Sequence, residues 1–401
     1  MRNNRQNQRV IIIISLTLAV IVAAAFGNIA YARSFPGGNH FVVGWAATRA
    51  FFSDATSPYS STAVTRIQDA ATWVTNPEER DALRFASPFY VIALYAPFAL
   101  IKDYAVARGL WMLVLEVSLI AIPLMTFRLT RRKAPFWLSI AAMILTLFSY
   151  NGITSLVDGN LVIFTTLILV WLITAVDRGQ DELAGILMAV ATMNLQSVLL
   201  VVLFILIWAF RKQRKDMLRW FAGSLVLLIG FSVLLIPNWF LQALQGVIQR
   251  YGQHQLASPG SIMVEAWGSI GMRLAVFLSV ILAGLLLREW ISAGNGSESY
   301  FVWAFFLTLA MSQWIGIPTE PGNFILLLPG ILFCIQVLLS RWGDRGKTAS
   351  LVIIGILMAV PWIFGAVTSE NVRMALMFLP MPLTAILLLY WTKWWAVRPV
   401  S

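Results

Sequence analysis

The chain has 401 residues, of which 59% are apolar and only 12% are charged, and its formal net charge is +11. Several nearly uncharged runs are long enough to cross a bilayer as helices, which takes about 20 residues. The alternating segments of roughly ten residues that a membrane barrel needs are absent. We therefore predict an all-α, polytopic membrane protein that forms a single integral membrane domain over residues 1–401.

The positive charge lies in short clusters between the apolar runs, mainly at residues 211–215 and 341–347. Cytoplasmic loops of membrane proteins are enriched in Lys and Arg, so these clusters need no anionic ligand, and nucleic acid is not an expected partner. The only cysteine, Cys334, lies inside an apolar run, which excludes a disulfide framework and a thiolate metal site.

The first apolar run covers residues 10–32 and follows three arginines. It is too long for the core of a signal peptide, and no convincing cleavage site follows it. We expect a first transmembrane helix with a cytoplasmic N-terminus in the cell membrane, which places residues 33–86 on the outer face.

Residues 33–86 form the one long polar segment, with five of the 18 acidic residues and one of the two histidines. Asn76 is a favourable N-cap and Pro77 suits a first helical position, so a short surface helix is predicted from Pro77 to about Phe85. We expect this first outer loop to be the catalytic loop. A second outer loop is expected at residues 242–271.

Eleven further apolar runs bring the predicted number of membrane helices to about twelve. They cover residues 87–101, 104–127, 134–150, 160–176, 183–210, 217–241, 272–290, 300–317, 323–340, 349–367 and 374–395. If all twelve runs cross the membrane in turn, the basic clusters lie on the cytoplasmic side, except the cluster at residues 128–133. That cluster would also be cytoplasmic if residues 87–101 were re-entrant and the helix near Asn194 were broken. Both topologies remain open. Both topologies place four segments outside: 33–86, 242–271, 318–322 and 368–373.

A helix lying at the membrane interface is predicted over residues 40–52. Its aromatic residues are expected to act as interfacial anchors: Phe41, Trp45 and Phe52. His40, Gly44 and Ala47 share one face of this helix. The two small residues would either leave a groove beside the imidazole or permit close packing of another helix, and spacing alone favours the packing.

Cations near the second outer loop offer a site for a lipid phosphate: Arg250, His254 and Arg273. Interfacial anchoring explains the same residues about as well. Among the residues expected inside the membrane, Glu116 and Asp158 are acidic exceptions, and such residues are candidates for function by default.

Sequence motifs for common soluble-enzyme chemistry are missing, including nucleophile elbows, phosphate-binding glycine loops and dinucleotide fingerprints. Two histidines, His40 and His254, cannot build a histidine-rich metal site. A general base on the outer face must come from the few carboxylates there or from the histidines.

From Gly38 to Ala50 the chain reads Gly-Asn-His-Phe-Val-Val-Gly-Trp-Ala-Ala-Thr-Arg-Ala, and Ser57-Pro58-Tyr59 follows. Later motifs are Ala86-Ser-Pro-Phe89, Ala96-Pro-Phe-Ala-Leu100, Gly159-Asn160, Asn194-Leu-Gln-Ser197 and a proline-containing turn that leads from Pro318 to Pro329. This series resembles the GT-C-type, polyprenyl-phosphate-sugar-dependent glycosyltransferases, in particular the mannosyltransferase-like glycosyltransferase family 87. The first outer loop of that family follows a pattern like Gly-x-Asp-Phe-x-x-Tyr-Trp-x-Ala-Ala-Arg-Ala.

His40 stands where the family pattern has an aspartate that is expected to be the catalytic base, and the Lys-x-x-Pro and Tyr-Pro-Pro elements are also altered. Either His40 takes over as base, or Asp54 does, or activity is lost. An ordinary imidazole has a pKa of about 6.5 and is largely neutral at pH 7, whereas a carboxylate with a pKa of about 3.9 is a weak base. His40 therefore ranks first, and Asp54, which needs the 57–59 turn to fold it back, ranks second.

The resemblance implies inverting transfer of a sugar, expected to be mannose, from a polyprenyl-phosphate donor to a glycolipid, glycan or protein acceptor on the outer face. It also implies that the reaction needs no metal and no cofactor. Loop residues expected to bind substrate are Asn39, Trp45, Arg49 and Tyr59, together with the cations Arg250, His254 and Arg273. The alternative predictions are a transporter or lipid flippase that uses Glu116 and Asp158, and a GT-C-like protein without activity.

Overall fold

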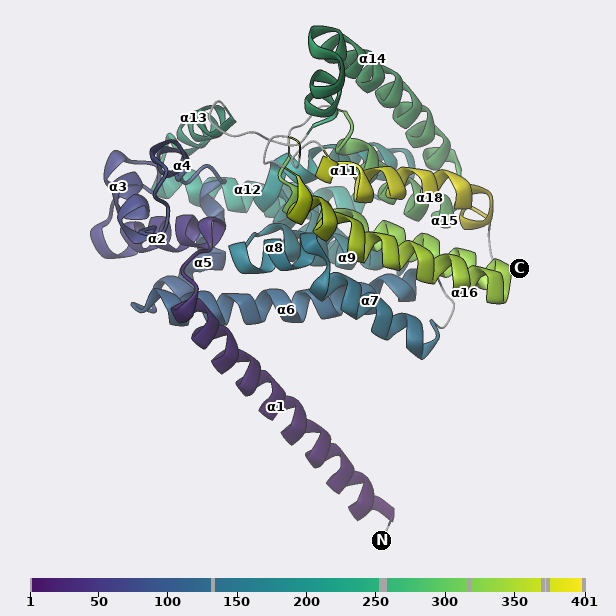
Figure 1. The fold of residues 1–401 in the computed structure, drawn as a ribbon, viewed down its shortest axis with the longest axis horizontal. Helices are drawn as coiled ribbons and strands as arrows, with labels where there is room; N and C mark the ends of the chain where they lie inside the picture. The colour runs from purple at the N-terminus through teal and green to yellow at the C-terminus, as the bar shows by residue number, and fades with distance from the viewer. Residues whose placement is uncertain are drawn as a thin grey trace. The chain divides into compact units, whose positions relative to one another are not determined.

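The computed structural model describes residues 2–130, 134–251, 258–315, 319–368, 372 and 376–398. Throughout these residues the chain forms α-helices and short 3-10 helices without a β-strand (Figure 1), which confirms the predicted all-α class. The chain divides into two compact units, and the first consists of Met1–Phe85, Val91–Val117 and Leu156–Asn160. The remaining residues form the second unit.

The first unit contains the polar segment 33–86, predicted as the first outer loop, and the helices that pack on it. Its elements are α1 (Arg2–Ser34), α2 (Asn39–Asp54), α3 (Ser61–Ala70), α4 (Pro77–Ala82), α5 (Ile92–Ala99), the first part of α6 (Tyr104–Leu129) and the end of α8 (Tyr150–Asp158). Helix α2 packs against both α3 and α5. Phe41 of α2 is fully buried and stacks on Trp111 of α6, with ring centroids 5.9 Å apart.

Both helices predicted within residues 33–86 are present. The interfacial helix predicted at residues 40–52 is α2, which extends one residue further at the start and two at the end. In α4 the Asn76 side chain accepts a hydrogen bond from the Glu78 N–H at 3.0 Å, and Pro77 is the first helical residue, as the capping signals predict. The helix ends at Ala82 rather than near Phe85, because Leu83 is already extended.

The aromatic residues of α2 are mostly core residues, so their prediction as interfacial anchors was wrong in part. Phe41 is fully buried and Trp45 is 7% exposed, and only Phe52 is largely exposed. A Cβ atom at Gly44 would lie 2.5 Å from the ring of Tyr95 in α5. The small residue at this position therefore lets α5 pack closely on α2 and does not leave a groove beside His40.

The second unit is a larger helical assembly. Its elements are α7 (Phe136–Phe148), most of α8, α9 (Val162–Asp177), α10 (Asp181–Ala191), η2 (Thr192–Asn194), α11 (Leu195–Arg211), α12 (Lys215–Leu235), α13 (Trp239–Tyr251), α14 (Pro259–Asn295), α15 (Glu298–Ser312), η3 (Pro321–Leu327), α16 (Leu328–Val367) and α18 (Pro380–Ala396), with η1 (Phe89–Val91) at its boundary. Every residue of α15 from Phe301 to Ser312 is buried. Helices α15, α16 and α18 lie side by side (Figure 1), so α15 is a central helix of this unit.

Six helices in the described part of the chain are long and apolar enough to cross a membrane. They are Ile14–Ser34, Tyr104–Leu129, Asp181–Arg211, Lys215–Leu235, Ala266–Asn295 and Pro321–Val367. A seventh is obtained if α7 and α8, which are bent by 51° relative to one another, form one span. The chain is therefore a multi-pass membrane protein.

The predicted number of about twelve membrane helices is not confirmed. Several predicted runs form helices of fewer than 18 residues, such as α5 with 8 residues and α15 with 15. Helix α16 instead contains most of the predicted run 323–340 and the whole run 349–367, separated by a kink at Gly343 with φ of +51°. The 40 residues of α16 are therefore two helical segments joined at this kink and not one straight helix.

One feature of the second predicted topology has a counterpart in the structure. The segment predicted as re-entrant forms only η1 and the short α5, which contains Pro97. The 3-10 turn η2 lies at Thr192–Asn194, where the helix break was predicted, but Asp181–Arg211 still counts as one candidate membrane span. Residues 242–251 and 259–271 are helical in α13 and α14, and the predicted outer turns at 318–322 and 368–373 lie partly outside the described residues.

The basic cluster at residues 211–215 holds helices of the second unit together. Lys212 donates to the Gly296 carbonyl at 2.9 Å, and Arg214 pairs with Asp181 at 2.7 Å and with Glu298 at 3.4 Å. Cations at a helix C-terminus are stabilising, and Gly296 directly follows α14. The cluster thus has a structural role in addition to the orientation signal that its charge provides.

Candidate active site

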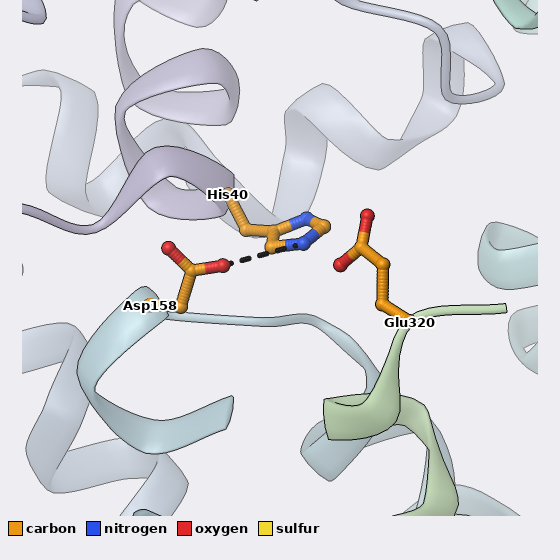
Figure 2. Close-up of side chains that lie close together, drawn as sticks. All are labelled: His40, Asp158 and Glu320. Carbon is orange, nitrogen blue, oxygen red and sulfur yellow. Dashed lines mark ion pairs between the residues drawn. The ribbon is translucent and has the colours of Figure 1, made fainter. Parts of the chain in front are cut away.

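The imidazole of His40, near the start of α2, faces the carboxylate of Asp158 at the end of α8 (Figure 2). Nε2 of His40 lies 3.3 Å from Oδ2 of Asp158, and the two side chains are 20% and 36% exposed. Oδ1 of the same carboxylate accepts a hydrogen bond from the backbone N–H of Asn39 at 2.8 Å. One carboxylate therefore holds both the imidazole and the first turn of the helix that carries it.

The N-terminus of α2 explains why a carboxylate is favourable here. The first N–H groups of a helix have no partner within the helix, and the helix dipole places a partial positive charge at this end. Asp158 satisfies one of these groups from another segment of the chain. Glu320, which Figure 2 also labels, belongs to the second unit, where it precedes η3.

Arg108 of α6 connects the two segments that carry His40 and Asp158. Its side chain is fully buried and donates to the carbonyls of Phe35 and Val157, each at 2.8 Å. A buried charge is costly unless it is well hydrogen-bonded, so these two bonds stabilise the guanidinium in the interior. In return, they hold the Phe35 and Val157 carbonyls at α6.

Two glycines allow close approach of these segments to neighbouring helices, Gly38 to α6 and Gly159 to α2. Gly38 has φ of +89°, and a Cβ atom there would lie 2.8 Å from Nε of Arg108 and 2.9 Å from the hydroxyl of Tyr104. Gly159 has φ of +69°, and a Cβ atom there would lie 2.5 Å from the Cβ atom of Phe41. The glycine of the Gly159-Asn160 motif thus brings Asp158 against α2.

Asn39, predicted as a substrate-binding residue, has its side-chain oxygen engaged within the unit. Nε1 of Trp73 donates to Oδ1 of Asn39 at 2.8 Å. The Trp73 ring stacks on Tyr104, with centroids 5.3 Å apart, and Tyr104 donates to the Gly37 carbonyl at 2.7 Å. These contacts fix the chain at the entry to α2.

Trp45 and Arg49, also predicted to bind substrate, hydrogen-bond to the C-terminal end of α5. Nε1 of Trp45 donates to the Phe98 carbonyl at 3.1 Å, and Nη1 of Arg49 donates to the Ala99 carbonyl at 2.9 Å. The guanidinium also lies 5.0 Å from the centroid of the Trp45 ring. Because the last carbonyls of a helix lack internal partners, this pair at i, i+4 spacing caps α5.

Asp54 is the last residue of α2 and lies 14 residues after His40, which is about 21 Å along one continuous helix. It forms an ion pair with Arg66 of α3. Since Asp54 belongs to the helix itself, the turn at residues 57–59 cannot fold it back towards His40. Tyr59 is half-buried, and its ring packs on Phe85 with centroids 5.3 Å apart.

The three predicted phosphate-binding cations belong to the second unit. Arg273 has an exposed side chain on α14. Arg250 lies in α13, but its side chain is outside the described residues, as is the whole of His254. Their assignment to a donor phosphate remains a prediction.

The sequence does not predict that Asp158 lies beside His40. Its sequence position makes it a candidate for function in general and for a transport path, but does not indicate a partner. The neighbouring Gly159 was the available signal, because a glycine next to a carboxylate permits close approach of another backbone.

The pair has the components of a general base. A neutral imidazole can accept a proton, and a carboxylate beside it orients the ring and stabilises the imidazolium that forms. Tyr95, which packs on Phe41, is unsuited to this role. Burial and, to a lesser extent, the negative charge of Asp158 raise the pKa of its hydroxyl, which stays protonated at neutral pH.

A comparison with protein families matches residues 85–312 to the model of glycosyltransferase family 87. The match covers more than half of the chain and includes Asp158 and the motifs at 159–160 and 194–197, whereas His40 precedes it. No curated protein matches the chain. On the strength of this match, the chain belongs to glycosyltransferase family 87.

Proposed function

We propose that this membrane protein transfers a sugar, expected to be mannose, from a polyprenyl-phosphate donor to an acceptor hydroxyl on the outer face of the cell membrane. Membership of a glycosyltransferase family supports sugar transfer rather than transport. The apolar helices support a donor that reaches the site from the bilayer. The pairing of His40 with Asp158 at 3.3 Å is the observation that carries the catalytic assignment.

In the proposed reaction, the acceptor oxygen forms a bond to the anomeric carbon of the sugar while the bond from that carbon to the phosphate oxygen breaks. The electron pair of the broken bond leaves with the polyprenyl phosphate, and the anomeric configuration inverts. His40 takes the hydroxyl proton on the ring nitrogen that is not directed at Asp158, and the Asp158 carboxylate stabilises the resulting imidazolium. The proposal includes no nucleotide, metal or other cofactor.

The remaining predicted site residues take different parts in this proposal. Asn39, Trp45 and Arg49 position α2 through the contacts described above. Arg250, His254 and Arg273 stay the proposed contacts for the departing phosphate, which carries negative charge, and Tyr59 stays a proposed acceptor contact.

The direct test uses purified protein in lipid vesicles, with polyprenyl-phosphate-mannose labelled in the sugar and a glycolipid acceptor. We expect label to move to the acceptor with inverted configuration at the anomeric carbon, and we expect none to move when the donor is a nucleotide-activated mannose. His40→Ala protein prepared in parallel is the matched control. Transfer from the nucleotide donor alone would exclude the proposed donor, and movement of the intact lipid across the bilayer without transfer would favour the flippase alternative.

The proposed orientation predicts different labelling of two exposed positions. In a Cys334→Ala background, Ser61→Cys should react with a membrane-impermeant thiol reagent in intact cells, because residues 33–86 are expected outside. Lys215→Cys, in the basic cluster, should react only after the membrane is permeabilised. Both side chains are exposed in the structure, so accessibility within the protein does not separate them. The reverse labelling pattern would contradict the orientation and the outer-face site with it.

A further inference from the structure

Helix α13 has three faces of different character. One is buried in the second unit: Trp239, Ala243 and Gly246. A second carries glutamines: Gln242, Gln245 and Gln249. A third consists of large apolar side chains that are between 46% and 63% exposed: Phe240, Leu241, Leu244 and Ile248.

Helical spacing separates these faces cleanly. At about 100° per residue, the apolar face is centred roughly a third of a turn from the glutamine face, and the buried face occupies the remaining third. Trp239 anchors the buried face through an edge-on contact with Tyr90 of the same unit, with ring centroids 6.1 Å apart. The protein covers one side of α13 and leaves an apolar side and a polar side exposed, as expected for a helix at a boundary between hydrocarbon and water.

The position of α13 in the chain places it near such a boundary. The preceding helix α12 is a candidate membrane span of 21 residues, about 32 Å long, which matches a hydrocarbon core of about 30 Å. Only residues 236–238 separate α12 from α13, so α13 begins within about 14 Å of the end of that span. The exposed apolar surface continues across this connection, since Leu234 at the end of α12 is 83% exposed.

We propose that α13 lies in the membrane interface, with Phe240, Leu241, Leu244 and Ile248 among the acyl chains of the leaflet in which α12 ends. The glutamine face then contacts water and lipid headgroups. The partner of this surface is the bilayer itself, because burial of four large apolar side chains in acyl chains is favourable and their exposure to water is not. This inference does not depend on the proposed catalytic activity.

The test compares neighbouring exposed positions of α13 in the full-length protein. Leu244→Cys, Ile248→Cys and Gln245→Cys, each in a Cys334→Ala background, are labelled with an environment-sensitive fluorophore and reconstituted into phosphatidylcholine vesicles. At positions 244 and 248 we expect blue-shifted emission that brominated acyl chains quench and aqueous iodide does not. At position 245 we expect red-shifted emission with the opposite quenching preference.

Two other results would overturn the inference. Quenching by iodide at all three positions would place the apolar face in water. Protection of positions 244 and 248 from both quenchers would show that protein covers this face, and a disulfide-linked dimer of Leu244→Cys would then identify a second copy as the cover. Elution of each variant as a single folded species in detergent, like the parent protein, is the control for folding.

Discussion

His40→Ala should reduce sugar transfer by roughly 10²–10⁴-fold, the usual contribution of general-base catalysis. Because the imidazole is only 20% exposed, its removal also deletes buried surface, so any loss of folded protein has to be measured separately from the loss of rate. The measurement is the initial rate of label transfer from polyprenyl-phosphate-mannose, divided by the amount of folded protein.

Two control variants separate the candidate bases. His40→Asp, which restores the residue of the family pattern, should retain much more transfer than His40→Ala. Asp54→Asn should transfer at close to the wild-type rate, since Asp54 pairs with Arg66 at the far end of α2. A wild-type rate for His40→Ala with loss of activity in Asp54→Asn would move the base to Asp54. Wild-type rates in both variants would place the chemistry elsewhere.

Local signals predicted the helices of the first outer loop well. The N-cap at Asn76 and the proline after it are short-range features whose structural effect depends on only a few neighbouring residues, and they located the start of α4. The number of membrane spans could not be obtained in the same way. A run of apolar residues such as α15 looks the same in sequence whether it faces lipid or, as here, is surrounded by other helices.

The site was harder to predict, because its parts are far apart in the sequence. His40 could be ranked first from its residue type and from the family pattern, but its partner Asp158 lies 118 residues later. No periodicity connects two such positions. The family pattern also could not distinguish a residue that binds substrate from one that supports the fold. Arg49 matches the pattern, yet its side chain caps α5.

The family match supports sugar transfer, and the structure supports the pairing of His40 with Asp158. The match at residues 85–312 establishes the family without including His40. The structure then links the unmatched first loop to a matched residue through the contacts of Asp158 with Asn39 and His40. A test of Asp158 examines that link directly.

Asp158→Asn should lower the transfer rate strongly, by up to about 10⁴-fold, the loss that the same exchange causes in a serine-protease triad. An amide keeps an oxygen that can accept the hydrogen bond from the Asn39 N–H, so the first turn of α2 should stay in place. What it removes is the negative charge beside the imidazole. Asp158→Ala also removes the hydrogen bond and should in addition destabilise the protein by about 0.5–2 kcal/mol, as loss of a helix N-cap does.

A double variant shows whether Asp158 acts through His40. The double variant His40→Ala/Asp158→Asn should be little worse than His40→Ala alone, because two residues that act as a unit are not additive. A wild-type rate in Asp158→Asn would mean that Asp158 only caps α2, and loss of activity in Asp158→Asn but not in His40→Ala would make the carboxylate itself the base.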